Sequence, residues 1–258
     1  SVEIASWMVP APSNKTAIFV FTLGGRERFR RSIDLLHGQR APLLSGSATS
    51  HWLGNAHDIT LRHDSAYLQS TGMLPHYQAQ TPAGAAALAA LPRSFVPLQQ
   101  GNWPNAMGSG GYSSSIGLLP EWDVLYLSSS AIEAFKGVVF NAYSAGRYNY
   151  HRRDETNAQM PHRPPLVSRY PALTLREPSP GWSTPPAASG PAPPPWSYSH
   201  QPSSGYLAYL LTGRLYFLEE VQLAAATNAL ASPYTWREGV KGIFKSQAAG
   251  AVRAVAWC

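Results

Sequence analysis

The chain has almost no cysteine and little charge. Its one cysteine, Cys258, is the last of 258 residues, which excludes an internal disulfide framework and a cysteine-ligated zinc finger. Charged residues make up 13% of the chain, about half the usual ~25% share. No apolar run reaches the ~20 residues that a membrane-spanning helix needs, so we expect no integral membrane protein and no membrane partner.

Several catalytic motifs are absent as well. The sequence holds no Gly-x-Ser-x-Gly nucleophile elbow, no Walker loop and no His-Glu-x-x-His pair. The glycines of Gly108-Ser109-Gly110-Gly111 lack the strand, the helix and the lysine that a phosphate-binding loop requires. Cysteine catalysis is not expected with Cys258 at the end of the chain. We therefore expect no cofactor.

The positive charge comes mainly from arginine. The formal net charge is +6, and arginine outnumbers lysine sixteen to four. This bias fits codon usage in a GC-rich bacterial genome, and it also fits bidentate recognition of carboxylate or phosphate. The densest basic cluster, residues 26–31, is interrupted by Glu27. We expect no nucleic-acid partner, although the net charge would steer anionic ligands such as acidic sugars.

The two ends of the sequence favour a fragment of a longer protein. The chain starts at Ser1, shows no signal-peptide pattern, and stops inside a predicted helix after Trp257 and Cys258. An export signal could therefore have been lost with a missing part. The compartment stays open, with a secreted or periplasmic location favoured.

Apolar spacing predicts a β-containing segment followed by helices. Residues 16–23 are uncharged and mostly apolar, and they predict a buried strand, ended by Gly24-Gly25. Residues 58–68 are ambiguous between strand and helix, and residues 104–119 predict a loop. We divide the chain into a mixed segment, 1–110, and a helical-hairpin domain, 111–258. Helices are predicted at 26–37, 82–91, 120–127, 130–144, 203–212, 215–231 and 239–257.

A proline-rich segment, residues 161–202, interrupts the predicted helices. Residues 191–195 read Pro-Ala-Pro-Pro-Pro and favour a polyproline II conformation. A loop of this length is usually functional or disordered. Trp182, Trp196 and Tyr198 favour an ordered loop, because aromatic rings can attach it to a surface.

Residues 115–258 carry a pattern of helical hairpins. His200-Gln201-Pro202-Ser203 leads into an apolar helix, a Thr212-Gly213 turn follows, and residues 215–220 begin the returning helix. Pro120-Glu121-Trp122 begins an earlier hairpin of the same kind. The pattern resembles the α/α-toroid proteins, which include many polysaccharide lyases and some glycoside hydrolases. The resemblance implies a mainly α fold, a partial toroid with a small β-containing N-terminal segment. A complete ring of six hairpins would need more helices.

A polysaccharide lyase would require a base, an acid and a group that neutralises the uronate carboxylate. Two polar and aromatic segments, 147–154 and 196–201, flank predicted helix ends, where toroid clefts are built. The alternative is that they hold ordinary loop residues and tyrosine anchors. The predicted catalytic residues are His200, Tyr198, His151 and Arg152. The predicted substrate-binding residues are Trp196, Arg147, Tyr150, Trp122 and Gln201.

Two other chemistries were weighed. Hydrolysis needs two carboxylates across a cleft, and the candidates are Glu121, Asp123, Asp154 and Glu155. The first two more simply begin a helix, and Glu219 and Glu220 are expected on an outer layer. His51, His57 and His63 recur every six residues and could bind zinc on extended chain. Gly54 and Asn55 argue against a continuous strand there, so no metal is predicted.

Two functions follow from these observations. The first is a carbohydrate-active protein such as a lyase that cleaves an acidic polysaccharide by proton abstraction. Its partner would be an extended poly- or oligosaccharide. The alternative is a non-enzymatic structural or assembly subunit of a particle or filament. In that hypothesis the proline-rich loop makes the subunit contacts, and a homo-oligomer is expected.

Overall fold

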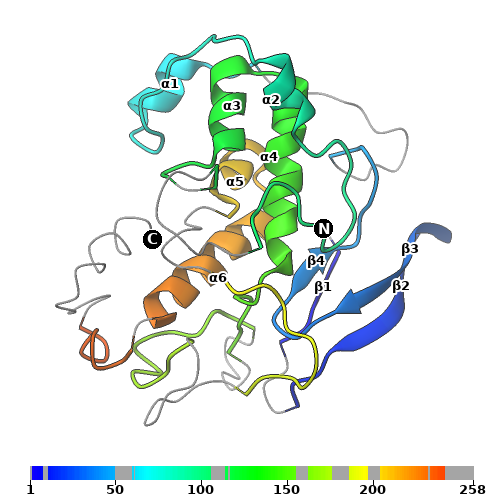
Figure 1. Cartoon of the computed structure of the whole chain (residues 1–258), viewed down its shortest axis with the longest axis vertical. Helices are drawn as coiled ribbons and strands as arrows, with labels where there is room; N and C mark the ends of the chain where they lie inside the picture. The colour runs from blue at the N-terminus through cyan, green and yellow to red at the C-terminus, as the bar shows by residue number, and fades with distance from the viewer. Residues whose placement is uncertain are drawn as a thin grey trace.

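The computed structural model combines a helical body with two small β-sheets (Figure 1). It describes residues 2–7, 11–49, 60, 62–105, 114–115, 117–154, 162–175, 186–196, 204–231 and 233–241. Of these residues, 31% are helical and 16% lie in strands. The prediction of a mainly α fold is therefore wrong, and the described chain is mixed.

Each sheet is a single antiparallel pair of strands. Strand β1 (Glu3–Ala5) pairs with β4 (Arg40–Pro42), and Ile4 lies opposite Ala41. Strand β2 (Lys15–Leu23) pairs with β3 (Arg26–Leu35) along its whole length. Strand β2 confirms that residues 16–23 form a strand, but the prediction that this strand is buried is wrong, because most of its residues are exposed. The β2–β3 hairpin extends to one side of the helical body in Figure 1.

The helix predicted at 26–37 is wrong, because residues 26–35 form strand β3. Gly24 and Gly25 both have positive φ, 59° and 72°, which suits a two-residue hairpin turn between twisted strands. The buried residues Phe29, Ile33 and Leu35 lie on one face of the strand, as alternation requires. Helical spacing groups Phe29 and Ile33 with Leu36, whereas strand alternation groups them with Leu35, and pairing with β2 selects the strand.

The helices agree better with the sequence. Strand β4 is followed by two short helices, α1 (Ser65–Ser70) and α2 (Ala85–Ala89). Helix α3 (Glu121–Ser129) begins after Pro120, and α4 (Ile132–Ser144) continues into a 3₁₀ turn, η1 (Ala145–Arg147). Helices α5 (Tyr206–Thr212) and α6 (Leu215–Ala231) follow the proline-rich segment. The predictions at 82–91, 120–127, 130–144, 203–212 and 215–231 are confirmed, whereas most of 239–257 lies outside the described residues.

Helix α4 is the centre of the core. Nine of its residues are buried, among them Val138, Val139 and Phe140. Helices α3 and α5 pack against it, and α5 packs against α6. Phe95 and Trp103, from the segment predicted as a separate N-terminal part, lie in this same core.

No toroid is present in the described part of the chain, so the partial α/α-toroid prediction is wrong. The hairpins α3–α4 and α5–α6 exist as the pattern predicted. They pack around α4 together with the loop residues Phe95, Trp103 and Trp196 and do not form a ring. Local hairpin spacing specifies helix pairs, and it does not specify how pairs are arranged.

The described parts of the proline-rich segment pack against other segments of the same chain. The Asn14 side-chain amide donates to the carbonyl oxygens of Ser189 (3.3 Å) and Pro191 (2.9 Å). The indole of Trp196 is buried in the core, and the backbone N–H of Leu175 donates to Leu230 O (2.9 Å). An ordered segment was predicted on the strength of its aromatic residues, and Trp196 acts in this way.

Among the described residues, we find no helix with both the length and the hydropathy needed to cross a membrane.

Candidate functional site: a buried charge cluster and an apolar hollow

Charged groups from four distant segments meet inside the molecule, and we call them the Glu220 cluster. Strand β1 supplies Glu3 and strand β4 supplies Arg40. Helix α6 supplies two adjacent glutamates, and the segment after η1 supplies three residues. The members are Glu3, Arg40, Tyr150, His151, Arg153, Glu219 and Glu220.

The carboxylate of Glu220 is fully buried and accepts three hydrogen bonds. Arg40 Nη1 donates to its Oε1 (3.2 Å), His151 Nε2 donates to its Oε2 (2.9 Å), and the Tyr150 hydroxyl also donates to Oε2. Burial by itself raises the pKa of Glu220, but His151, Arg40 and Tyr150 outweigh it and hold the pKa below its ordinary value. Glu220 is therefore an ionised carboxylate in the folded chain.

The ring of His151 is fully buried among partners from its own chain. Its Nδ1 lies 3.0 Å from the carbonyl oxygens of both Gly38 and Tyr148, and its Nε2 faces Glu220. Both ring nitrogens therefore have partners within the chain.

Arg40 joins the buried and the half-exposed carboxylates. Its Nη2 donates to Glu3 Oε2 (2.5 Å) and to Glu219 Oε2, and its guanidinium lies 3.9 Å from the centre of the Tyr216 ring. Arg153 stands 3.5 Å from Glu3 and 3.6 Å from Glu219. Burial lowers the pKa of Arg40, but Glu220 and Glu3 more than compensate and raise it. The arginines and glutamates alternate, so each charge has a partner within the chain.

The predicted sugar-stacking aromatics form part of the core. Trp122 and Trp196 are 3% and 8% exposed, and Tyr150 is fully buried. The Tyr150 and Trp196 rings lie 4.5 Å apart, and the Trp196 indole donates to Asn228 Oδ1 (2.9 Å). In this arrangement none of the three presents a ring face to solvent.

The remaining predicted site residues are dispersed. Arg147 is hydrogen-bonded to Asn105 (2.8 Å) at an exposed position. Arg152 is largely buried, which lowers its pKa, and its Nη1 has no hydrogen-bond partner. Tyr198, His200 and Gln201 lie outside the described residues. The structure thus brings together Tyr150, His151 and Trp196 of the predicted set, and their catalytic and binding roles stay predictions.

The candidate carboxylates for hydrolysis have local partners or are buried. Asp123 is 5% exposed, and burial raises its pKa well above its ordinary value. Asp154 accepts from the Tyr170 hydroxyl (2.7 Å) and lies 3.6 Å from Arg169. Glu121 is exposed at the first turn of α3, and Glu155 lies outside the described residues.

The histidine series does not form a metal site where it is described. His63 Nε2 is 2.9 Å from Leu127 O, and its ring packs 5.3 Å from Tyr126. His51 and His57 lie outside the described residues. Across the part of the chain that the structure describes, no three His, Cys, Asp or Glu side chains are placed to hold a metal ion.

Sequence reasoning missed most of the Glu220 cluster. Glu219 and Glu220 were expected on an outer layer, yet Glu220 is fully buried, so that prediction is wrong. The signal was present in α6, because Tyr216, Leu223 and Thr227 are buried at the spacing that also buries Glu220. Leu215, Leu218 and Val221 lie on the more exposed side of the helix.

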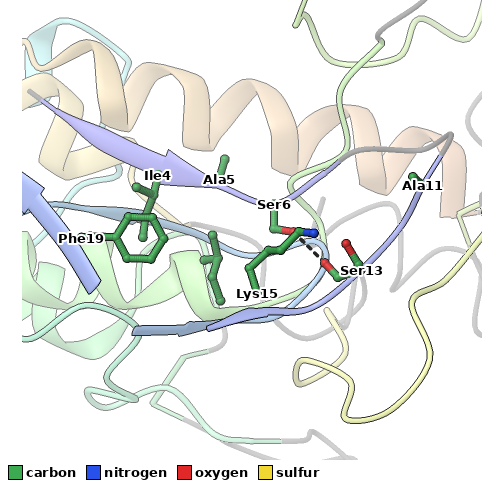
Figure 2. Close-up of a pocket in the computed structure, with 8 residues that line it drawn as sticks. Ile4, Ala5, Ser6, Ala11, Ser13, Lys15 and Phe19 are labelled. Atoms are coloured by element: carbon green, nitrogen blue, oxygen red, sulfur yellow. Dashed lines mark hydrogen bonds between the residues drawn. The ribbon is translucent and has the colours of Figure 1, made fainter. Parts of the chain in front are cut away.

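A second feature is an apolar hollow between β1 and the β2–β3 hairpin (Figure 2). Its volume is about 390 Å³. Among the described residues, five apolar and three polar ones line it. They are Ile4, Ala5, Ala11, Phe19 and Leu35, with Ser6, Ser13 and Lys15.

Comparison with known proteins gives no relative. No protein-family model, no curated protein and no solved structure matches this chain. Its function must therefore be argued from the geometry above.

Proposed function

We propose that the chain is a non-enzymatic assembly subunit in which two copies associate through strand β2. The observation that carries the proposal is the open outer edge of this strand. Within the described residues β2 pairs only with β3. Its apolar side chains are accessible, with Ile18 64% exposed and Val20 and Leu23 each 43% exposed. An unpaired edge of this kind is a template for another strand.

The edge of β2 lacks the features that normally prevent strand addition. Residues 16–23 contain no charge and no proline. The register shift between Phe21 and Thr22 places the extra residue, Arg28, on β3. The other edge of the hairpin differs, because β3 carries four arginines. Charged side chains protect an edge strand from pairing, so β2 is the favoured edge.

Strand β2 is compatible with its own copy. In an antiparallel pair centred on Phe19, Ile18 lies beside Val20 of the second copy, and Thr16 lies beside Thr22. The only charge, Lys15, lies beside Leu23. The two β3 strands would be about 14 Å apart, three strand spacings, which exceeds the ~8 Å Debye length at physiological salt. Their arginines therefore do not oppose the association.

The Glu220 cluster and the aromatic core support a non-enzymatic role, because their side chains are buried and cannot reach a ligand in solution. Arg40, His151 and Glu220 are fully buried and satisfy one another. Groups in this state stabilise the chain and are not available to a polymer in solution. The assembly hypothesis from the sequence used the proline-rich segment, but its described parts contact their own chain. We therefore assign the contact to β2.

Sedimentation velocity of the full chain over a concentration series tests the proposal. We expect a reversible dimer with a Kd below about 100 μM. Val20→Lys places a charge on the edge and should give a monomer. Ser32→Lys adds the same charge to the same face of the hairpin, one strand away from the edge, and should still dimerise. A chain that stays monomeric throughout, or loses its dimer equally in both variants, would overturn the proposal.

Cross-linking tests the register. In a Cys258→Ser background, Thr16→Cys with Thr22→Cys should form a covalent dimer. Facing Cα atoms in antiparallel strands lie about 4.5–5.5 Å apart, within disulfide range. Thr16→Cys with Leu23→Cys is shifted by one residue and should cross-link poorly. Equal cross-linking by both pairs would contradict the register.

The lyase hypothesis stays as a second candidate because of Arg152. Its Nη1 is buried without a partner, and such a group could bind a carboxylate. An assay for unsaturated product with alginate, pectin, hyaluronan and heparin tests it. Product formation that is lost in His200→Ala would favour the lyase. No product from any polymer would leave assembly as the function.

A further inference from the structure

The hollow between β1 and β2 is polar at one end and apolar at the other. Figure 2 shows Ile4 and Phe19 together at one end, with Ser6, Ser13 and Lys15 grouped toward the other. The Ser6 hydroxyl donates its hydrogen to Ser13 O (3.3 Å), so the Lys15 ammonium supplies the donor that an acceptor group of a ligand would meet at this end. The lining therefore matches a molecule with one polar end.

The charges around the hollow have one sign. The register of the hairpin places Lys15 and Phe19 on one face, opposite Leu35 and Arg31. Within the described part of the chain, neither Lys15 nor Arg31 takes part in an ion pair. In the paired stretches of β2 (15–21) and β3 (29–35), this face bears no acidic residue.

The opposite face of the same hairpin is balanced. Arg30 pairs with Glu27 (2.6 Å), and Thr16 donates to Asp34 (2.8 Å). The acidic residues of the hairpin, Glu27 and Asp34, thus lie only on the face that points away from the hollow. The contrast within a single hairpin indicates that the face beside the hollow is complementary to an anion.

We propose that this hollow binds an anionic amphiphile, an unbranched alkyl carboxylate of about ten carbons. A volume near 390 Å³ is at the small end of the ~300–1,000 Å³ range of ligand sites. The alkyl chain lies against Ile4, Phe19 and Leu35, and the carboxylate meets the Lys15 ammonium beside Ser6 and Ser13. This inference does not depend on the association of two β2 strands.

Calorimetric titration of the full chain with decanoate, below the concentration at which it forms micelles, tests the proposal. We expect saturable binding of one decanoate per chain. Decyltrimethylammonium has the same alkyl chain and the opposite charge, and it should bind at least tenfold more weakly. Acetate keeps the carboxylate without the chain and should not bind. Equal binding of the anionic and cationic amphiphiles, or none by decanoate, would overturn the proposal.

Two variants and a matched control locate the site. Lys15→Met keeps the length of an exposed side chain and should weaken decanoate binding about tenfold, the effect of one favourable charge contact. Ala11→Trp should block the hollow and abolish binding. Arg30→Met removes the same charge from the opposite face and should leave binding unchanged. An Arg30→Met loss as large as that of Lys15→Met would show non-specific attraction to a basic protein and overturn the assignment.

Discussion

The helical body buries polar side chains, whereas the β2–β3 hairpin exposes apolar ones. In the body, polar side chains such as Arg40, His151 and Glu220 are buried and paired. In the hairpin, apolar side chains such as Ile18 and Val20 are exposed. Buried ion clusters fix how segments of one chain meet, whereas exposed apolar strands favour contacts with other molecules. The comparison therefore separates the part that holds the fold from the part that is free to bind.

The two regions also differ in the size of their cores. The body packs aromatic and aliphatic residues from all of its larger helices into one cluster. The hairpin contributes Phe29, Ile33 and Leu35 to a small separate cluster with Leu43. Local stability follows the amount of buried apolar contact. The hairpin should therefore open more readily than α4.

The largest effect is expected from Arg40→Met. The variant leaves Glu220 without its arginine and Glu3 and Glu219 without their strongest partner, so the free energy of unfolding should fall by about 3–5 kcal/mol. Urea denaturation measures it. Arg30→Met, which breaks an exposed pair in the hairpin, should have a much smaller effect. Similar losses in both variants would mean that the buried cluster does not hold the body together.

Gly146→Ala should have the next largest effect. A Cβ at Gly146 would lie 2.0 Å from the Arg40 carbonyl oxygen and 2.9 Å from the Tyr216 hydroxyl, so β4 must move away from η1. We expect a loss of about 1–3 kcal/mol of unfolding free energy. Gly84→Ala meets no atom within 4 Å and should be nearly neutral in the same denaturation experiment. Little change in Gly146→Ala would contradict this close packing.

Two buried carboxyls of the body should respond to pH in opposite directions. The pKa of Glu220 is lowered, so its contribution to stability is present above its ordinary pKa of 4.5 and is lost as the pH falls. Burial raises the pKa of Asp123, so the folded state is favoured below the ordinary pKa of 3.8 and that advantage is lost as the pH rises.

Thermal unfolding of Glu220→Gln and Asp123→Asn between acidic and neutral pH measures this difference. Glu220→Gln should be less stable than the parent at pH 7, with a deficit that shrinks under acidic conditions. Asp123→Asn should be more stable at pH 7 by about 1 kcal/mol, with a gain that shrinks toward acid. Parallel pH profiles for the two variants would contradict the opposite shifts.

The smallest effect on stability is expected from Ile18→Thr. Ile18 is 64% exposed, and surface substitutions usually change the unfolding free energy by less than about 0.5 kcal/mol. Dimerisation should nevertheless weaken, because Ile18 lies at the proposed contact. Denaturation and sedimentation of the same variant separate the two effects. A large loss of stability would show that the residue belongs to the core of its own chain.

Sequence reasoning succeeded where local pattern and structure coincide. Proline before Glu121 and apolar spacing within 132–144 were sufficient to predict α3 and α4, because helix signals are short-range. The same reasoning failed at residues 26–35. There the apolar residues fit the ~3.6-residue period of a helix as well as the two-residue alternation of a strand. Only pairing with β2 selects the strand.

The candidate site was harder to predict because its members are distant in sequence. Tyr150 and His151 were singled out for their chemistry, but nothing local shows that both are hydrogen-bonded to Glu220, which also accepts from Arg40. Trp122 and Trp196 were expected on a surface. Aromatic residues beside polar ones suit a binding cleft and a core equally well, and burial alone distinguishes them.

The contact between Arg40 and Glu220 also constrains when the chain can fold. The two residues are separated by 180 positions, and Glu3 reaches the same guanidinium from the first strand. During synthesis the contact between Arg40 of β4 and Glu220 cannot form until α6 has emerged from the ribosome. Until then, the Arg40 side chain stays exposed to solvent. Docking of the N-terminal strands should accordingly be among the last steps of folding, after the helices have assembled.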